Sequence, residues 1–281
     1  HLKKSLNEII LQNNKKFSRR EILKLGVAAL PALALKSDNI NKRLQNFYVL
    51  MIYPRNNSSF IMGIYDFFKN MGLIEKNIFL LYTFGPKVQW QIPNVKLEYT
   101  ATRTGLLNAI EKLKSKLKAS DTLFIFFHNH GVLQNDINQG KPSIQILSDY
   151  SGDNSFISVL ELSNMLNQVP ARRIVFLAGQ CYGADFGINL SELLKNKILT
   201  FFTFADQEKV SYGTDFEIEL LFSDVIYNGQ AKKAIFKDQK YDHNKDGYVS
   251  FKEAVEALKE LNTGNFPNII GPDYYFPKRF F

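Results

Sequence analysis

The sequence predicts an α/β protein whose central sheet is mostly parallel and covered by helices on both faces. Short runs of apolar, β-branched and aromatic residues without alternation are typical of strands buried on both sides. Segments with helical periodicity separate these runs, as expected for parallel strands joined by crossover helices. The runs lie within residues 47–53, 78–82, 121–131, 172–183 and 198–204.

Four segments between or after these runs are predicted to be helical. Gly72 suits the C-cap of the first, and Thr104 is expected to cap the start of the second. Ser158 is the expected N-cap of the third, with Glu161 at the capping-box position. The predicted helices cover residues 60–71, 104–118, 158–167 and 217–227.

Two of the apolar runs end in a reactive side chain. One run ends in His130 followed by Gly131, and the other ends in Cys181, the only cysteine in the chain. Ligands of open α/β sheets sit outside the carboxyl ends of the strands. A histidine and a cysteine at two such ends can therefore meet, although about 50 residues separate them.

Composition indicates a globular protein. The chain has 281 residues, of which 45% are hydrophobic and 22% charged, which is not a disordered composition. Residues 1–34 carry seven Lys or Arg and two Glu, so they supply +5 of the +8 net charge. The remaining +3 or so does not indicate a nucleic-acid-binding protein. A single cysteine excludes an intramolecular disulfide framework and a cysteine-rich metal site.

Residues 1–34 resemble an export signal. Ser18 to Lys24 resembles a twin-arginine signal, and an apolar run from Leu25 to Leu35 follows it. That run is too short to span a bilayer, and Ala32-Leu33-Ala34 fits a small-x-small cleavage pattern. We therefore expect a periplasmic or secreted protein without a stable membrane span. An amphipathic first helix is the alternative.

Cys181 and His130 together suit nucleophilic catalysis. A thiol attacks a peptide carbonyl well as thiolate or with a base in reach, and histidine is the natural base near neutral pH. Backbone N–H groups at strand-end turns can stabilise the oxyanion. Each residue taken singly has a plainer explanation, a buried core thiol for Cys181 and a satisfied histidine for His130. His128 competes for the base role, because side chains two apart on a strand point the same way.

The chain resembles the caspase/legumain group of cysteine peptidases over residues 47–227. The resemblance rests on the helix at 102–113, the strand at 119–131 that ends in His-Gly, and the strand that ends in Gln180-Cys181-Tyr182-Gly183. It implies a three-layer αβα caspase-like fold. Residues 204–213 are similar to the legumain branch, where a Ser-Tyr pair helps to line the specificity pocket.

The resemblance also implies roles for residues. His130 becomes the general base, Cys181 the nucleophile, and the N–H groups of Gly131 and Cys181 the oxyanion hole. Peptides or proteins become the substrates, without an organic cofactor. Ser211, Asp206 and Arg55 are the implied substrate-binding residues. Where relatives carry an acid before the cysteine, this chain has Gly179 and Gln180, with Asp185, Asp206 and Glu208 as possible substitutes.

Residues 242–253 match a twelve-residue EF-hand calcium loop at each expected place. Oxygen ligands are expected at positions one, three, five, seven, nine and twelve, with a glycine, Gly247, at the sixth. A loop that caps the next helix without metal is the alternative. We expect a structural calcium ion. The implied ligands are Asp242, Asn244, Asp246, Tyr248 (through its carbonyl), Ser250 and Glu253.

The predicted organisation is an export signal over 1–34, a peptidase domain over 47–230 and a C-terminal extension over 231–281. The leading function is a cysteine endopeptidase that acts through an acyl-thioenzyme. A transamidase or peptide ligase on the same site, and a catalytically silent binding domain, stay open. The oligomeric state is not predicted.

Overall fold

The computed structural model describes residues 46–55, 57–83, 87, 95, 97–133, 142–145, 156–205, 214–227, 229–261, 265 and 267–276. They belong to one compact unit that spans Leu44–Phe281. The predicted export segment lies outside the described residues. Among the described residues, no helix is both long and apolar enough to cross a membrane.

A six-stranded sheet forms the centre, with the order β11-β8-β7-β3-β1-β2. Five strands run parallel and β11 pairs antiparallel with β8. The first five lie where strands were predicted, but β3 ends at His128 and β7 at Gly179, three and four residues before the ends of the predicted runs. The strands are β1 (Phe47–Tyr53), β2 (Ile78–Tyr82), β3 (Thr122–His128), β7 (Arg173–Gly179), β8 (Ile198–Thr203) and β11 (Asn268–Ile270).

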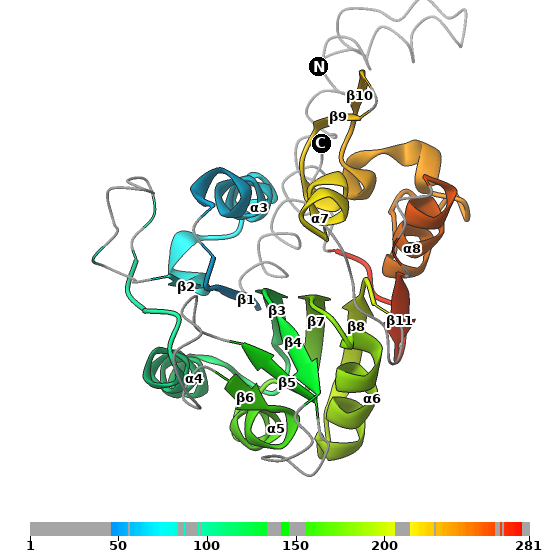
Figure 1. Ribbon diagram of the computed structural model, residues 1–281. Helices are drawn as coiled ribbons and strands as arrows, with labels where there is room; N and C mark the ends of the chain where they lie inside the picture. Colours follow the sequence, from blue (N-terminus) through cyan, green and yellow to red (C-terminus); the bar gives the residue numbers. More distant parts are fainter. Residues whose placement is uncertain are drawn as a thin grey trace, which may run out of the picture. The chain divides into compact units, whose positions relative to one another are not determined.

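Helices cover both faces of this sheet, so the fold has the three predicted αβα layers (Figure 1). Successive strand residues serve opposite cores: Phe124 and Phe126 pack in one, Ile125 and Phe127 in the other. This explains why the strands are apolar without alternation. One layer holds α3 (Ser58–Asn70), α7 (Thr214–Phe222) and α8 (Phe251–Glu260); the other holds α4 (Arg103–Lys116), α5 (Val159–Asn167) and α6 (Gly183–Leu193).

Local capping sets the helix starts. Ser158 caps α5 as predicted, since its side chain accepts a hydrogen bond from the Glu161 N–H. The cap of α4 is Thr102 rather than Thr104: the Thr102 hydroxyl accepts from the Gly105 N–H at 3.0 Å. Both threonines are plausible caps by type, and the extended backbone of Thr102 decides between them.

The prediction that the last helix continues to Tyr227 is wrong. Helix α7 ends at Phe222, and β9 (Val225–Tyr227) pairs antiparallel with β10 (Gln230–Lys232). The β-branched Val225 and Ile226 favour a strand, and Gly229, at φ +76°, supplies the left-handed turn residue.

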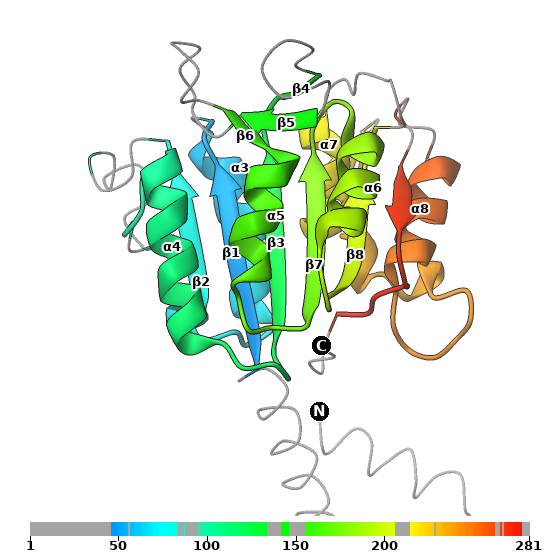
Figure 2. The ribbon, with the colours of Figure 1, turned by 90° about the horizontal axis from the view of Figure 1, so that it is seen from below.

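A small antiparallel sheet lies at the carboxyl ends of the parallel strands (Figure 2). It consists of β4 (Gly131–Leu133), β5 (Pro142–Gln145) and β6 (Phe156–Ser158). These strands lie between the end of β3 and the start of α5 along the chain. The sheet ties the segment after His130 to the start of α5.

Residues after 230 share the core of the preceding chain. Short 3-10 turns, η4 (Ile235–Lys237) and η5 (Gln239–Tyr241), lead to α8, as η1 (Glu75–Asn77) leads to β2. The Phe251 ring lies 6.5 Å from Phe124 and 5.3 Å from Phe202, measured between centroids. Phe276 lies 5.5 Å from Phe124. The C-terminal residues therefore complete the layer that contains α3 and α7.

Candidate active site

The ends of three neighbouring strands bring the candidate residues together. Arg55 lies two residues after β1, His130 two residues after the end of β3, and Cys181 two residues after β7. Because these strands are adjacent and parallel, their carboxyl ends meet at one edge of the sheet. A cavity of about 270 Å³ lies there. Its lining is Arg55, His128, Asn129, His130, Gly179, Cys181, Thr214, Asp215 and Phe216.

The backbone turns sharply directly after Cys181. Tyr182 has a left-handed conformation, at φ +55°, and α6 starts at the next residue. A Cβ atom on Gly183 would lie 1.9 Å from the Thr203 hydroxyl oxygen, so only glycine fits against the end of β8. The turn leaves the thiol half-buried and free of any disulfide. A left-handed non-glycine residue stores strain and is often found at a functional site.

Gly131 permits close contact between the segments that carry His130 and Cys181. A Cβ atom at this position would lie 2.2 Å from the Cys181 carbonyl oxygen. The backbone of the Cys181 segment therefore comes close to that of Gly131. Any side chain here would push the histidine segment away from Cys181.

His128 lines the cavity, is buried and contacts three segments. Its Nδ1 lies 2.7 Å from the Gly179 carbonyl oxygen, and its Nε2 contacts Asp215 Oδ1 at the start of α7. Arg55 Nη1 donates to the same Asp215 oxygen at 2.7 Å. A Cβ atom on Gly179 would lie 2.4 Å from Nδ1, so glycine makes room for the ring. Both histidines line the cavity, but His128 is buried whereas His130 is exposed.

Charges around the cavity shift two pKa values. The pKa of His130 is lowered by burial first, and then by the positive charges of Arg55 and His128. The pKa of Asp215 is lowered chiefly by its hydrogen bond to His128, against an opposing effect of burial, with a further contribution from Arg55. The lowered pKa values favour the neutral form of His130 and the ionised form of Asp215.

The structure places some predicted residues and not others. Arg55 lines the cavity, and its substrate-binding role stays a prediction. Asp185 instead accepts a hydrogen bond from Asn189 within α6 and is not among the lining residues. Gln180 is buried, and its side-chain amide has no hydrogen-bond partner among the described residues. Ser211, Asp206 and Glu208 lie outside the described residues.

Sequence reasoning missed Asp215, the carboxylate of the cavity. It follows Ser211-Tyr212 by three residues and lies in the first turn of α7. An acid is common in the first turn of a helix because it complements the helix dipole. The position of Asp215 in the sequence therefore gives no sign of a functional role. Only the fold brings this residue into contact with His128 and Arg55.

The predicted calcium loop has the EF-hand backbone features. Gly247 has φ +88° at the sixth position. Glu253 closes the loop, since its Oε1 accepts from the Asn244 N–H at 3.1 Å and its Oε2 from the Ser250 N–H at 2.8 Å. Asp242 accepts from the N–H groups of Asp246 and Gly247. The oxygen donors suit calcium in kind and order, but the described residues contain no group of three or more His, Cys, Asp or Glu side chains gathered as a metal site.

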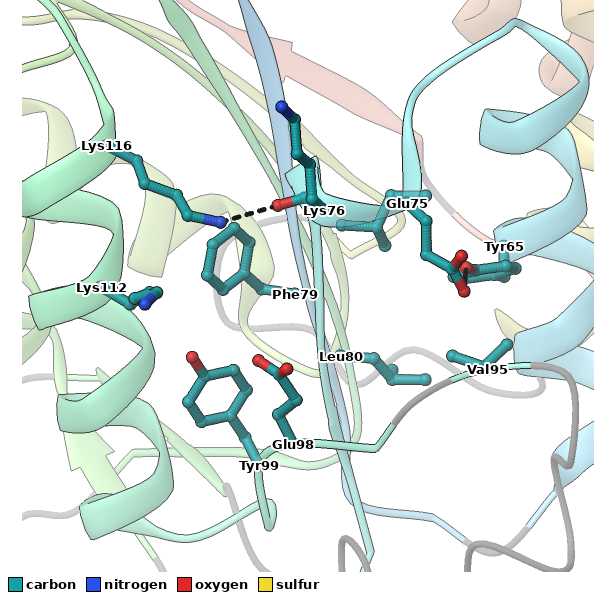
Figure 3. Close-up of a pocket in the computed structure, with 11 residues that line it drawn as sticks. Tyr65, Glu75, Lys76, Phe79, Leu80, Val95, Glu98, Tyr99, Lys112 and Lys116 are labelled. Carbon is teal, nitrogen blue, oxygen red and sulfur yellow. Dashed lines mark hydrogen bonds between the residues drawn. The ribbon is translucent and has the colours of Figure 1, made fainter.

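A second and larger cavity, of about 500 Å³, lies along the sheet edge formed by β2. Lys112 and Lys116 reach it from α4, and Tyr65 and Glu75 lie on the other side of β2 (Figure 3). Lys116 Nζ donates to the Lys76 carbonyl oxygen at 2.9 Å. Large pockets are the usual first guess for an active site. The smaller cavity is the better candidate here, because it holds the thiol and the imidazoles.

Comparisons with known proteins identify no family for this chain. No protein-family model matches the chain, and no curated protein matches it. Among solved structures, the chain is similar to protein GSU0716 from Geobacter sulfurreducens, with 12% sequence identity and a TM-score of 0.46. The match covers 80% of this chain and 92% of that one. A likeness at this level says nothing about activity.

Proposed function

We propose that the protein is a cysteine endopeptidase, with Cys181 as the nucleophile and His130 as the general base. The observation that carries the proposal is the shared cavity, which places a half-buried thiol and a histidine of lowered pKa at adjacent strand ends. The resemblance to the caspase/legumain group supports the same two roles. The N–H groups of Gly131 and Cys181 are the proposed oxyanion donors.

The proposed reaction has two steps. His130 takes the thiol proton as Cys181 Sγ attacks the peptide carbonyl, and the returning proton leaves with the amine of the C-terminal product. Water then attacks the acyl-thioenzyme, again with His130 as base, and releases the N-terminal product. A neutral His130 at the start of each step is the form that this sequence of proton transfers needs.

The charges that line the cavity should influence which substrate residue binds next to the cleaved bond. Arg55 and His128 place two basic groups beside one carboxylate, Asp215. We expect acidic or carboxamide side chains to bind next to the cleaved bond in preference to Lys or Arg. Electrostatic complementarity of this kind mainly sets specificity.

A peptide-library digestion tests the proposal. The full chain is incubated with a mixed peptide library, and new termini are identified by mass spectrometry. The expected result is cleavage after a narrow set of residues, abolished in Cys181→Ser and lowered about 10²–10⁴-fold in His130→Ala. Cleavage that persists in both variants would contradict it. An added amine nucleophile separates hydrolysis from transamidation by the mass of the product.

Calcium binding by residues 242–253 is a second part of the proposal. Two features support calcium binding: the backbone conformation of Gly247, and the oxygen-bearing residues at the positions where an EF-hand loop has its ligands. When bound, calcium would supply positive charge that offsets the carboxylates of Asp242, Asp246 and Glu253. At a hundredfold excess over Kd, it should add about 2.7 kcal/mol to the free energy of unfolding.

Thermal melting with and without calcium tests this part. Wild type and Glu256→Gln, an exposed neighbour on α8 that contacts His243, should show a higher Tm in millimolar calcium. Glu253→Gln should lose most of that shift. Equal melting curves for wild type with calcium and with chelator would rule out the site.

A further inference from the structure

The larger cavity, along β2, is lined by more basic than acidic side chains. Glu75 is already engaged on the side away from α4: its Oε1 accepts a hydrogen bond from the Tyr65 hydroxyl at 3.1 Å, and its Oε2 lies 3.8 Å from Lys69 Nζ. Among the described lining residues, Glu98 is then the other carboxylate, and it faces three lysines. The charged lining residues are Glu75, Lys76, Glu98, Lys112 and Lys116.

Two of these lysines lie on one face of α4. Lys112 and Lys116 are four residues apart, and like charges at this spacing destabilise a helix. Both side chains reach toward the cavity (Figure 3). Neither forms a salt bridge with a carboxylate in the described part of the chain, whereas Lys114 on the same helix pairs with Glu111 at 2.8 Å. The positive charges of Lys112 and Lys116 therefore face the cavity without an acidic partner of their own.

Lys116 holds its ammonium group against an aromatic ring. Its Nζ lies 5.0 Å from the centroid of the Phe79 ring and donates to the Lys76 carbonyl oxygen at 2.9 Å. An ammonium group has three donors, so a single carbonyl acceptor does not use them all. The pKa of Lys116 is lowered by burial first and then by the positive charge of Lys112, with Glu98 acting in the opposite direction. The protein therefore compensates this charge only in part.

The remaining lining of the cavity is largely apolar. In the described sheet β2 is the edge strand, and the Phe79 and Tyr99 rings stack beside it at 6.1 Å between centroids. Leu80 and Val95 lie away from the lysines, toward Tyr65 (Figure 3). The volume of about 500 Å³ is typical of small-molecule sites. One part of the cavity is therefore positively charged and the other apolar.

We propose that this cavity binds a small organic phosphate, with the phosphate group at Lys112 and Lys116 and the apolar part of the ligand against Leu80 and Val95. Lysine binds phosphate as a point charge. A phosphate monoester carries about −1.5 to −2 charge at pH 7, which matches two neighbouring ammonium groups. A bound phosphate would relieve the repulsion between the two lysines. The site shares no lining residue with the cavity at Cys181, and it does not depend on the proposed peptidase activity.

Isothermal titration calorimetry of the full chain with phenyl phosphate tests this proposal. Phenyl phosphate joins a phosphate group to an apolar ring, whereas inorganic phosphate has the charge alone. We expect phenyl phosphate to bind at one site, at least tenfold more tightly than inorganic phosphate. Lys112→Gln and Lys116→Gln should each weaken the binding of phenyl phosphate about tenfold, as expected for the loss of one charged hydrogen-bond donor.

Two further variants separate a built site from a general effect of charge. Lys114→Gln removes the same charge from the same helix, but Lys114 pairs with Glu111 and is not among the lining residues. This variant should leave the affinity unchanged. Glu98→Gln should bind phenyl phosphate more tightly, because it removes a negative charge that acts on Lys116.

Thermal melting of each variant shows whether it is folded. Lys112 is exposed, so Lys112→Gln keeps the test decisive if Lys116→Gln does not fold. Any of three results would overturn the proposal: no binding at millimolar phenyl phosphate, equal weakening in Lys112→Gln and Lys114→Gln, or equal affinities for phenyl phosphate and inorganic phosphate.

Discussion

At single residues, the candidate site contains close contacts that leave no room for a side chain. Gly131 is the sharpest case, because a methyl group there would lie 2.2 Å from the Cys181 carbonyl oxygen. The contact is with backbone, which cannot rotate away as a flexible side chain can. Glycine is required here because there is no room for a Cβ atom, and not because the backbone has an unusual conformation.

Gly131→Ala should lower peptide cleavage roughly 100-fold while the protein stays folded. Overpacking should cost about 1–3 kcal/mol of unfolding free energy. Gly229→Ala is the matched control: its Cβ would meet nothing within 4 Å, and its φ of +76° makes it strained. That variant should lose stability but keep its rate. Equal rates in the two variants would argue against a tight Gly131–Cys181 contact.

The pH dependence of the reaction follows from the lowered pKa of His130. A histidine that acts as a base is active when neutral, and a lowered pKa keeps it neutral at more acid pH. The acid limit of Cys181 reactivity should therefore lie below 6.5, the ordinary pKa of histidine. Arg55→Gln removes one of the positive charges that lower the pKa of His130, so the acid limit of Cys181 reactivity should move to higher pH. Lys114→Gln, on the surface of α4, should not move it. An acid limit above 6.5 in the wild type contradicts the assignment.

At the scale of elements, the turn between β7 and α6 sets where the thiol points. Tyr182 holds a left-handed conformation there. Asparagine tolerates this conformation, whereas a β-branched residue does not. Tyr182→Asn should therefore keep the reactivity of Cys181, and Tyr182→Ile should lose about 1–2 kcal/mol of unfolding free energy together with that reactivity. Urea unfolding and alkylation rates measure the two effects. Similar behaviour of both variants would mean that the turn is not strained.

The elements also show what the sequence can and cannot predict. The five parallel strands and their reactive ends follow from apolar runs, because burial on both faces leaves a clear pattern. Strand β11 has three residues at an edge, too few to form a pattern. Helix α7 was extended too far because Val225 and Ile226 continue its apolar spacing. Asp215 and the surroundings of His128 could not be predicted, since both depend on contacts across 87 residues.

At the scale of the whole molecule, residues after 230 are expected to unfold with the sheet. Phe251 is fully buried against the strand residues Phe124 and Phe202. Phe251→Ala should lower the free energy of unfolding by about 3–5 kcal/mol. Cys181 should become accessible in the same urea transition in which the helical circular dichroism signal is lost. Tyr275→Ala, 40% exposed, should cost far less. Two separate transitions would show that the C-terminal residues fold independently.

The central claim is that Cys181 is a nucleophile activated by His130. Labelling with an electrophilic peptide probe, read by mass spectrometry of the intact chain, tests it most directly. The account predicts one label per chain, on Cys181, at a rate far above that of a small thiol such as glutathione. It predicts that His130→Ala loses this excess rate and that His243→Gln keeps it. Labelling at the rate of an ordinary thiol, unchanged in His130→Ala, would contradict the claim.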